Sequence, residues 1–444
     1  MNTTHRTDNN ITLTTLTKAN AMRHSLSGLR AIITAALIAV TTTFATSAQE
    51  AGSAYSRLGY GLLRTNATSM QSQMGSVGYA MRSGRQINVM NPASYAAIDS
   101  LTFLFDMGVD LSSTNMKDAS ESVNRLGGGL NYITLQFPIS KNIGGSVGLL
   151  PYSTVNYYFG NEIDGGTNLR QGSGGLSQLY LGLSARPFRG FTLGANIAYL
   201  FGTITHDVQT TPTGTSTALF EQVMEVRDYN VDLGLQYGFD IDRNNTVTLG
   251  LTYSPGKTFL GHAWVTKYDT SNDIDNNSIK ADTVVERVAM KDRFTRPETW
   301  GAGISYSWRN RFMIETDFTY QPWASAKFLE VDNFAGTRLA DRWSFNAGAE
   351  YTHTRRGNYF SRISWRIGGF YARDYVMVGD NNVRDYGLTC GLGLPAPGSK
   401  SMVNIGFQWR HRQAYPQALL TENHFTFTLG INFNELWFFK NKIN

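Results

Sequence analysis

The chain has 444 residues, of which 16% are charged and 12% are aromatic. Soluble domains usually carry about 25% charged residues, so this composition excludes a disordered or highly charged chain. The single cysteine, Cys390, excludes a disulfide-based scaffold and a thiolate metal site. Only one sustained apolar run is present, near the N-terminus, which excludes a bundle of membrane helices.

Residues 1–48 predict a secretory signal peptide. The apolar run 31–40 follows Arg23 and Arg30 and precedes the small residues 45–48. This is the order of a basic region, a short apolar core and a cleavage site, and the run is too short for a bilayer span of roughly 20 residues. Met22 is a possible true start. No cysteine follows the cleavage site, so a lipoprotein anchor is not expected.

The basic balance of the chain belongs largely to this leader. The whole sequence has 39 Lys and Arg and 34 Asp and Glu, and the leader holds four of the former and one of the latter. The mature chain therefore has 35 cations and 33 anions, a net charge of +2. A nearly neutral chain gives no reason to expect a nucleic-acid partner.

Beyond residue 100 the sequence alternates with a period of two. Phe425, Phe427, Leu429, Ile431 and Phe433 share one parity, with polar residues or glycine between them. Strict alternation is the signature of a β-strand, because successive side chains point to opposite faces. The pattern predicts fourteen strands, near 101–112, 127–138, 143–155, 175–186, 190–205, 222–240, 245–258, 297–308, 311–323, 342–353, 359–375, 384–395, 401–413 and 423–435.

The connections between these strands fall into two alternating classes. Some are short, such as 140–142, 187–189, 242–244 and 309–310, and the others are longer: 113–126, 156–174, 206–221, 259–296, 324–341, 376–383 and 414–422. Short turns on one side and long loops on the other are typical of an outer-membrane barrel. An even number of strands places both ends of the barrel on the periplasmic side.

The alternative fold is a soluble β-sandwich, whose aromatic residues would lie in the middle of the strands. Here aromatic residues also gather near strand ends, at 157–159, 320–323 and 437–439, as expected for the girdles of a membrane barrel. We therefore predict an all-β protein, a fourteen-stranded antiparallel transmembrane β-barrel at residues 101–444. Its expected location is the bacterial outer membrane, with membrane lipid as a partner.

Residues 49–100 do not alternate and are rich in glycine. A short helix is possible within 68–83, and Asn91-Pro92-Ala93 predicts a turn, because proline fixes φ and asparagine satisfies nearby backbone groups. A barrel of this size encloses a lumen. The segment is therefore interpreted as an N-terminal hatch or plug; the alternative is a flexible periplasmic tail.

Asn91-Pro92-Ala93, placed directly before the first strand, resembles the hatch motif of the long-chain fatty-acid transporter (FadL/TodX-like) family. Residues 250–255 and 296–306 resemble its seventh-strand ending and eighth-strand opening, and residues 433–440 resemble its Bacteroidota branch. The resemblance covers residues 52–442 and implies a fourteen-stranded barrel with a hatch. It also implies passive uptake of hydrophobic or amphipathic small molecules such as long-chain fatty acids.

Barrels of secretion and assembly machines, such as the PorV-like shuttle, resemble the same family. The alternative function is therefore a non-transporting barrel subunit of an outer-membrane protein assembly or secretion complex, with outer-membrane proteins or lipoproteins as partners. In the FadL-like transporters an interruption of the third strand opens a lateral gap in the wall. Here Pro151 lies in that strand and cannot donate to the ladder, so it is a candidate for the opening; an ordinary bulge is the alternative.

Several charged residues have the parity opposite to the apolar positions of their predicted strands and are expected to face the lumen. They are Asp232, Glu315, Asp317, Arg362, Arg366 and Arg410. A charge facing lipid would cost roughly 2–4 kcal/mol at the bilayer centre. These groups are either a binding site for the headgroup of an amphipathic cargo or a salt-bridge network that holds the hatch.

Enzymatic activity is not expected. Residues 144–148 match the G-x-S-x-G pattern but begin a strand and do not form a strand-to-helix elbow. His206-Asp207 suggests a hydrolase only weakly. The Asp and Asn residues of 269–277 have no bidentate Glu at EF-hand spacing, so neither a metal nor a cofactor is predicted.

Overall fold

The computed structural model describes residues 52–118, 121–163, 165–213, 217–270, 280–284, 288–329, 337–354 and 357–436. The predicted signal peptide, the acidic segment 271–277 and the aromatic residues 437–439 lie outside the described residues. Within these ranges, no helix is long and apolar enough to cross a bilayer.

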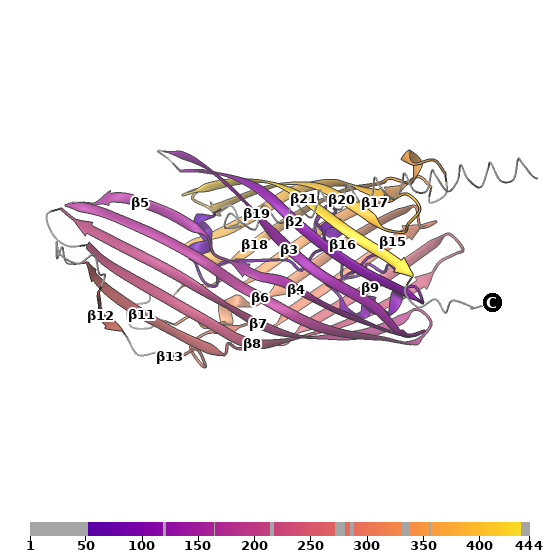
Figure 1. The fold of residues 1–444 in the computed structure, drawn as a ribbon, viewed down its shortest axis with the longest axis horizontal. Coiled ribbons are helices and arrows are strands. Elements are labelled where there is room, and N and C mark those ends of the chain that lie inside the picture. The colour runs from indigo at the N-terminus through magenta and orange to yellow at the C-terminus, as the bar shows by residue number, and fades with distance from the viewer. Residues whose placement is uncertain are drawn as a thin grey trace, which may run out of the picture. The chain divides into compact units, whose positions relative to one another are not determined.

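Fourteen antiparallel strands close into a barrel, as predicted (Figure 1). Each pairs with the next in chain order, and the last, β21, pairs with the first, β2, from Thr102–Leu436 to Lys117–Thr421. The strands are β2 (Thr102–Lys117), β3 (Ser122–Ser140), β4 (Ile143–Thr154), β6 (Gly166–Phe188), β7 (Phe191–Pro212), β8 (Thr217–Asp240), β9 (Asn245–Ser254), β15 (Thr299–Trp308), β16 (Phe312–Gln321), β17 (Arg342–Thr352), β18 (Ser364–Val378), β19 (Asn381–Pro395), β20 (Met402–Tyr415) and β21.

The outer face of the barrel wall is apolar, and many of the alternate, inward-facing residues are polar. On β6, Leu179 and Leu181 are each at least half exposed, whereas the alternate residues Gln178 and Ser184 are buried. The alternation in the sequence therefore separates a lipid-facing band from the lumen, as it does in outer-membrane barrels. The protein is located in the bacterial outer membrane.

Several of the predicted long loops are shorter in the structure, because the strands on either side of them are longer than predicted. β6, β7 and β8 have 23, 22 and 24 residues, whereas β9, β15 and β16 have 10 each. Much of the predicted loops 113–126, 156–174 and 206–221 is therefore strand. Paired strands continue beyond the bilayer on the extracellular side, where the lipid no longer imposes alternation on the sequence.

The extracellular side also carries shorter elements. β5 (Tyr157–Ile163) continues the edge of β6, and β11 (Gly261–Thr270) extends the sheet beside β8. The remaining ones are β10 (Lys257–Thr258), β12 (Lys280–Val284), β13 (Val288–Ala289), β14 (Thr295–Arg296) and the 3-10 helix η3 (Trp323–Ser325).

Residues 53–100, here called the hatch segment, contact the inner faces of the barrel strands and appear in indigo among them in Figure 1. The segment contains η1 (Ala54–Arg57), β1 (Leu62–Leu63), α2 (Ser69–Ser72) and η2 (Pro92–Ala97). Helix α2 confirms a helix within 68–83, although it is only four residues long. Thr68 and Gln71 form a capping box at its start, which satisfies backbone donors that a helix leaves unpaired.

Toward the extracellular side the barrel contains an apolar cluster, here called the upper core. The hatch segment supplies Tyr60, the wall and loops supply Phe259, Trp323 and Tyr375, and all four are almost fully buried. The ring of Tyr60 lies 4.7 Å from that of Phe259, and the ring of Trp323 lies 4.6 Å from that of Tyr375. Aromatic pairs at this spacing are favourable beyond the area they bury.

Candidate functional site

The hatch segment is seated against a belt of inward-facing glycines. Every barrel strand except β3 and β16 contributes at least one glycine at which an added Cβ would come within 3.0 Å of a hatch atom. The belt comprises Gly108, Gly144, Gly182, Gly194, Gly234, Gly238, Gly250, Gly301, Gly303, Gly348, Gly368, Gly391, Gly406 and Gly430. An added Cβ would meet the hatch backbone itself at Gly144, Gly194, Gly250, Gly348 and Gly368. Real Cβ atoms do not approach other atoms so closely, so at these positions only glycine allows the hatch backbone to lie directly on the wall.

Asn91-Pro92-Ala93, the expected hatch motif, lies against this belt. The Asn91 side chain caps η2 by accepting a hydrogen bond from the Ala93 N–H at 3.0 Å. Its Nδ2 donates to the carbonyl of Tyr79 in the hatch, at 2.7 Å, and to that of Leu235 on β8, at 3.2 Å. The motif thus organises the hatch internally and also ties it to the wall.

On β16, where the belt has no glycine, two of the predicted lumen carboxylates hold the hatch. Glu315 and Asp317 are both buried. Asp317 accepts hydrogen bonds from the N–H groups of Gly78, at 2.7 Å, and Tyr79, at 3.0 Å, and Glu315 accepts one from Ala80 N–H at 2.8 Å. These contacts satisfy backbone N–H groups that would otherwise be buried without an acceptor, so the two residues anchor one loop of the hatch.

Arg366 performs the same task on β18. It is buried and donates to Glu350 at 2.7 Å, to Gln73 of the hatch at 2.9 Å and to Asn404 at 2.7 Å. The structure therefore brings Glu315, Asp317 and Arg366 to the hatch interface. This geometry favours the interpretation of these charges as a network that holds the hatch.

The remaining predicted lumen charges lie elsewhere. Asp232 accepts from Asn230 at 3.0 Å and from Ser254 at 2.5 Å. Arg410 pairs with Asp385 at 3.6 Å. None of these three partners belongs to the hatch segment.

Arg362 does not lie on a strand, which corrects the predicted start of that strand at 359. It belongs to the 3-10 helix η4 (Phe360–Arg362), and β18 begins only at Ser364. The segment turns because Thr354 N–H donates to the carbonyl of Ser361, and the Ser361 hydroxyl donates to that of Asn358. The alternating residues before Ser364 therefore belong to a turn between β17 and β18 and not to a strand.

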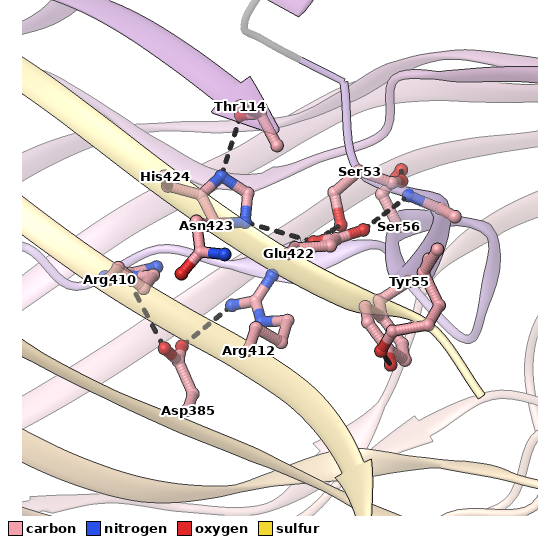
Figure 2. Close-up of polar contacts among 12 residues, drawn as sticks. Ser53, Tyr55, Ser56, Thr114, Asp385, Arg410, Arg412, Glu422, Asn423 and His424 are labelled. Atoms are coloured by element: carbon pink, nitrogen blue, oxygen red, sulfur yellow. Dashed lines mark hydrogen bonds and ion pairs between the residues drawn. The ribbon is translucent and has the colours of Figure 1, made fainter. Parts of the chain in front are cut away.

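Near the extracellular end, a buried carboxylate holds the start of the hatch (Figure 2). Glu422 on β21 accepts from the Ser53 hydroxyl at 2.7 Å and from Ala54 N–H at 2.9 Å, and it contacts His424 Nε2 at 3.0 Å. On the neighbouring strand, Arg412 is paired with Asp385 at 2.8 Å. No motif in the sequence indicated this group, although Glu422 and His424 share one parity.

Tyr55 adds a neutral contact at the same level. Burial raises the pKa of Tyr55 to about 12, so its hydroxyl remains protonated. It donates to the carbonyl of Leu420 at 2.5 Å and accepts from Ala414 N–H at 2.9 Å. The hatch start is therefore tied to the wall by charged and by neutral hydrogen bonds.

The barrel wall is interrupted between β3 and β4 near Pro151. The ladder joining these strands ends at Ile133–Leu149, and the register of β4 against β6 shifts between Pro151 and Ser153. Beyond this point β4 pairs with β1 of the hatch, through Leu62–Thr154 and Leu63–Ser153. Proline has no N–H for the ladder, which explains why the interruption occurs here.

Arg64, directly after β1, crosses the interruption on the lumen side. Its guanidinium donates to Asp110 on β2 at 3.3 Å and to Asn131 on β3 at 3.0 Å. The hatch thus bridges the two sides of the broken ladder, a role that no pattern in the sequence indicated.

Ser146 and His206, which weakly suggested a hydrolase, form hydrogen bonds with different partners. The Ser146 hydroxyl donates to the carbonyl of Leu135 at 2.7 Å and lies 2.8 Å from the Tyr180 hydroxyl. His206 Nδ1 lies 2.8 Å from the Tyr157 hydroxyl. Each group has a partner of its own.

Comparison with solved structures supports the same architecture. The chain is similar to the Pseudomonas putida toluene transporter TodX, with 14% identity, 85% of this chain and 100% of that chain covered, and a TM-score of 0.58. It is similar to the Ralstonia pickettii toluene transporter TbuX (13% identity, 83% and 98% covered, TM-score 0.55) and to a Pseudomonas aeruginosa FadL homologue (12% identity, 84% and 99% covered, TM-score 0.58). At these identities the likeness shows a shared fold.

No curated protein sequence matches the chain. A sequence model of the BamG family, in contrast, matches residues 29–444 and so covers the whole barrel and the hatch segment. With a FadL-like barrel and a match of this extent, the chain belongs to the BamG family.

Proposed function

We propose that this protein is a closed barrel subunit of an outer-membrane protein assembly complex and does not carry cargo through its lumen. The observation that carries the proposal is the packing of the hatch inside the barrel. Toward the periplasm the hatch segment lies on the glycine belt, and toward the outside its Tyr60 is buried in the upper core together with side chains of the wall and loops.

Opening this lumen would be costly. Burial of a large apolar side chain contributes about 1.5–3 kcal/mol. Exposing Tyr60, Phe259, Trp323 and Tyr375 together would therefore cost on the order of 6–12 kcal/mol, before any hydrogen bond of the hatch is broken. A barrel built in this way is better suited to present its outer surfaces to other proteins.

The match to the BamG family model also favours this function over transport. The fold it shares with hydrocarbon channels would then serve as a scaffold. Its partners would be other outer-membrane proteins or lipoproteins.

The test is native mass spectrometry of the tagged protein, gently extracted from its own outer membrane. A stoichiometric complex with other barrels or lipoproteins is expected. Depletion of the protein should lower the amount of folded outer-membrane barrels and leave fatty-acid uptake unchanged. A lone barrel that carries an apolar ligand, together with an uptake defect on depletion, would contradict the proposal.

A second candidate function is passive uptake of hydrophobic small molecules, and the interrupted ladder at Pro151 favours it. Cargo would leave through the wall between β3 and β4, where pairing stops at Leu149. Uptake of a labelled long-chain fatty acid by cells carrying Pro151→Val tests this route. Reduced uptake at equal barrel abundance is expected for a transporter, and unchanged uptake would remove the route.

A further inference from the structure

Above the interruption, two strand segments have an unpaired edge. Residues Ser122–Leu130 of β3 pair with β2, and the ladder to β4 includes β3 only from Ile133 onward. Residues Tyr157–Ile163 of β5 pair with β6. In the part of the chain that the structure describes, no strand pairs with the other edge of either segment.

These two edges border the same opening, here called the notch (Ser122–Leu130 and Tyr157–Ile163). β5 follows β4, which is the neighbour of β3 lower in the wall. The Arg125 guanidinium lies 5.8 Å from the centre of the Tyr158 ring. A side chain of one edge thus reaches the other, and the notch is narrow.

The rim of the notch exposes large apolar side chains as well as backbone. Leu126 is 81% exposed and Tyr158 is 54% exposed, and Val123, Phe159 and Ile163 are also exposed. The β3 edge has no side chains over the three residues Gly127, Gly128 and Gly129. Natural proteins cover or blunt edges of this kind, since a free edge with apolar residues is a template for another strand.

We propose that the notch binds one extended segment of a partner protein by strand addition, in which backbone hydrogen bonds provide affinity and alternate side chains provide specificity. β5 has 7 residues, so a partner segment that pairs along the whole of its edge has at least that length. Apolar residues at every second position would cover Leu126 and Tyr158. This inference rests on the proposed function, because it names the surface through which the barrel would join its complex.

The narrow opening favours a single segment over a second copy of this barrel. β3 runs toward the periplasmic turn at residues 141–142, whereas β5 runs away from it. One added strand is therefore antiparallel to one edge and parallel to the other. Cross-links from successive positions of β3 can show in which direction the added strand runs.

The first test places the photo-crosslinker p-benzoylphenylalanine at Asn124, Leu126 or Gly128 in cells, and maps each adduct by mass spectrometry. If a strand is bound, all adducts lie within one segment of one protein. Moving the cross-linker by two residues along β3 then moves the cross-linked residue of the partner by about two residues. The control position is Leu251, a lipid-facing residue of β9 that is 55% exposed, which should give no such series. Adducts with lipid alone, with this chain itself or scattered over many proteins would overturn the proposal.

The second test compares Arg125→Pro with Leu126→Pro. Neighbouring residues of a strand direct their N–H groups to opposite edges, so one proline faces β2 and the other faces the notch. Loss of the partner in native mass spectrometry is expected for the notch-facing proline, while heat-modifiable migration shows that the barrel is folded. A lone wild-type barrel would overturn the proposed function, whereas an intact complex in both variants would overturn only the notch.

Discussion

The hatch segment is held inside the barrel by different means at two levels. Toward the periplasm the hatch backbone lies directly on glycines such as Gly250 and Gly368, and its position is fixed by hydrogen bonds that Asp317 accepts and Arg366 donates. Toward the outside the same segment contributes Tyr60 to an apolar core. One chain segment is thus held by close polar contact at one level and by hydrophobic burial at the next.

The difference indicates separate tasks for the two levels. Polar contacts at short range specify one position, because a displaced hatch would leave buried donors and acceptors unpaired. Apolar burial is less directional and depends mainly on area. The lower half therefore defines where the hatch sits, and the upper core provides much of the free energy that keeps it there.

The largest expected effect is on the upper core. Trp323→Ala removes a side chain that packs against Tyr60 and Tyr375 and should lower the free energy of unfolding by about 3–5 kcal/mol. Denaturant unfolding in detergent measures it. Phe360→Ala, at an aromatic residue that is 78% exposed, is the control and should change stability by less than about 0.5 kcal/mol.

A smaller loss is expected in the polar half. Asp317→Ala leaves the N–H groups of Gly78 and Tyr79 without their acceptor and should cost about 2–4 kcal/mol. Hydrogen exchange at these two amides should accelerate more than exchange in the upper core. Asp317→Asn keeps one acceptor oxygen and should lose less; equal losses would argue against this role.

The glycine belt offers a comparison between neighbouring residues. At Gly368 an added Cβ meets the backbone of Met74 and Gly75, whereas at Gly369 its nearest neighbour lies at 3.3 Å. Gly368→Ala should therefore destabilise by about 1–3 kcal/mol, the usual range for overpacking, and increase ion conductance in planar bilayers. If Gly369→Ala has the same effect, close contact with the hatch is not the cause.

The smallest effect is expected at the surface. Lys400 and Asp99 form an exposed ion pair at 3.7 Å. Lys400→Ala should change the free energy of unfolding by at most about 1 kcal/mol, and less at high salt. A larger loss would mean that this pair restrains the end of the hatch segment.

The sequence predicted the barrel well where the bilayer constrains it. The strands predicted at 143–155 and 423–435 are Ile143–Thr154 and Thr421–Leu436, because lipid on one side and the lumen on the other impose alternation over these residues. The strand predicted at 175–186 extends over Gly166–Phe188. Above the membrane both faces contact water or protein, so the pattern no longer marks where a strand ends.

The site was predicted in part. The parity of Glu315, Asp317 and Arg366 indicated the lumen, and the structure places all three at the hatch. The glycine belt was not recognised, since a glycine between apolar residues fits any outward-facing pattern equally well. The pairing of β1 with β4 depends on contacts distant in sequence, which local periodicity does not encode.

The seam between β2 and β21 has a consequence for the order of folding. It joins Thr102 to Leu436, residues at opposite ends of the barrel sequence, and contacts so distant in the chain form slowly. The hatch segment precedes β2 and is enclosed by the finished wall. We therefore expect the hatch to be seated before the seam closes, so that β2 and β21 pair last, around it.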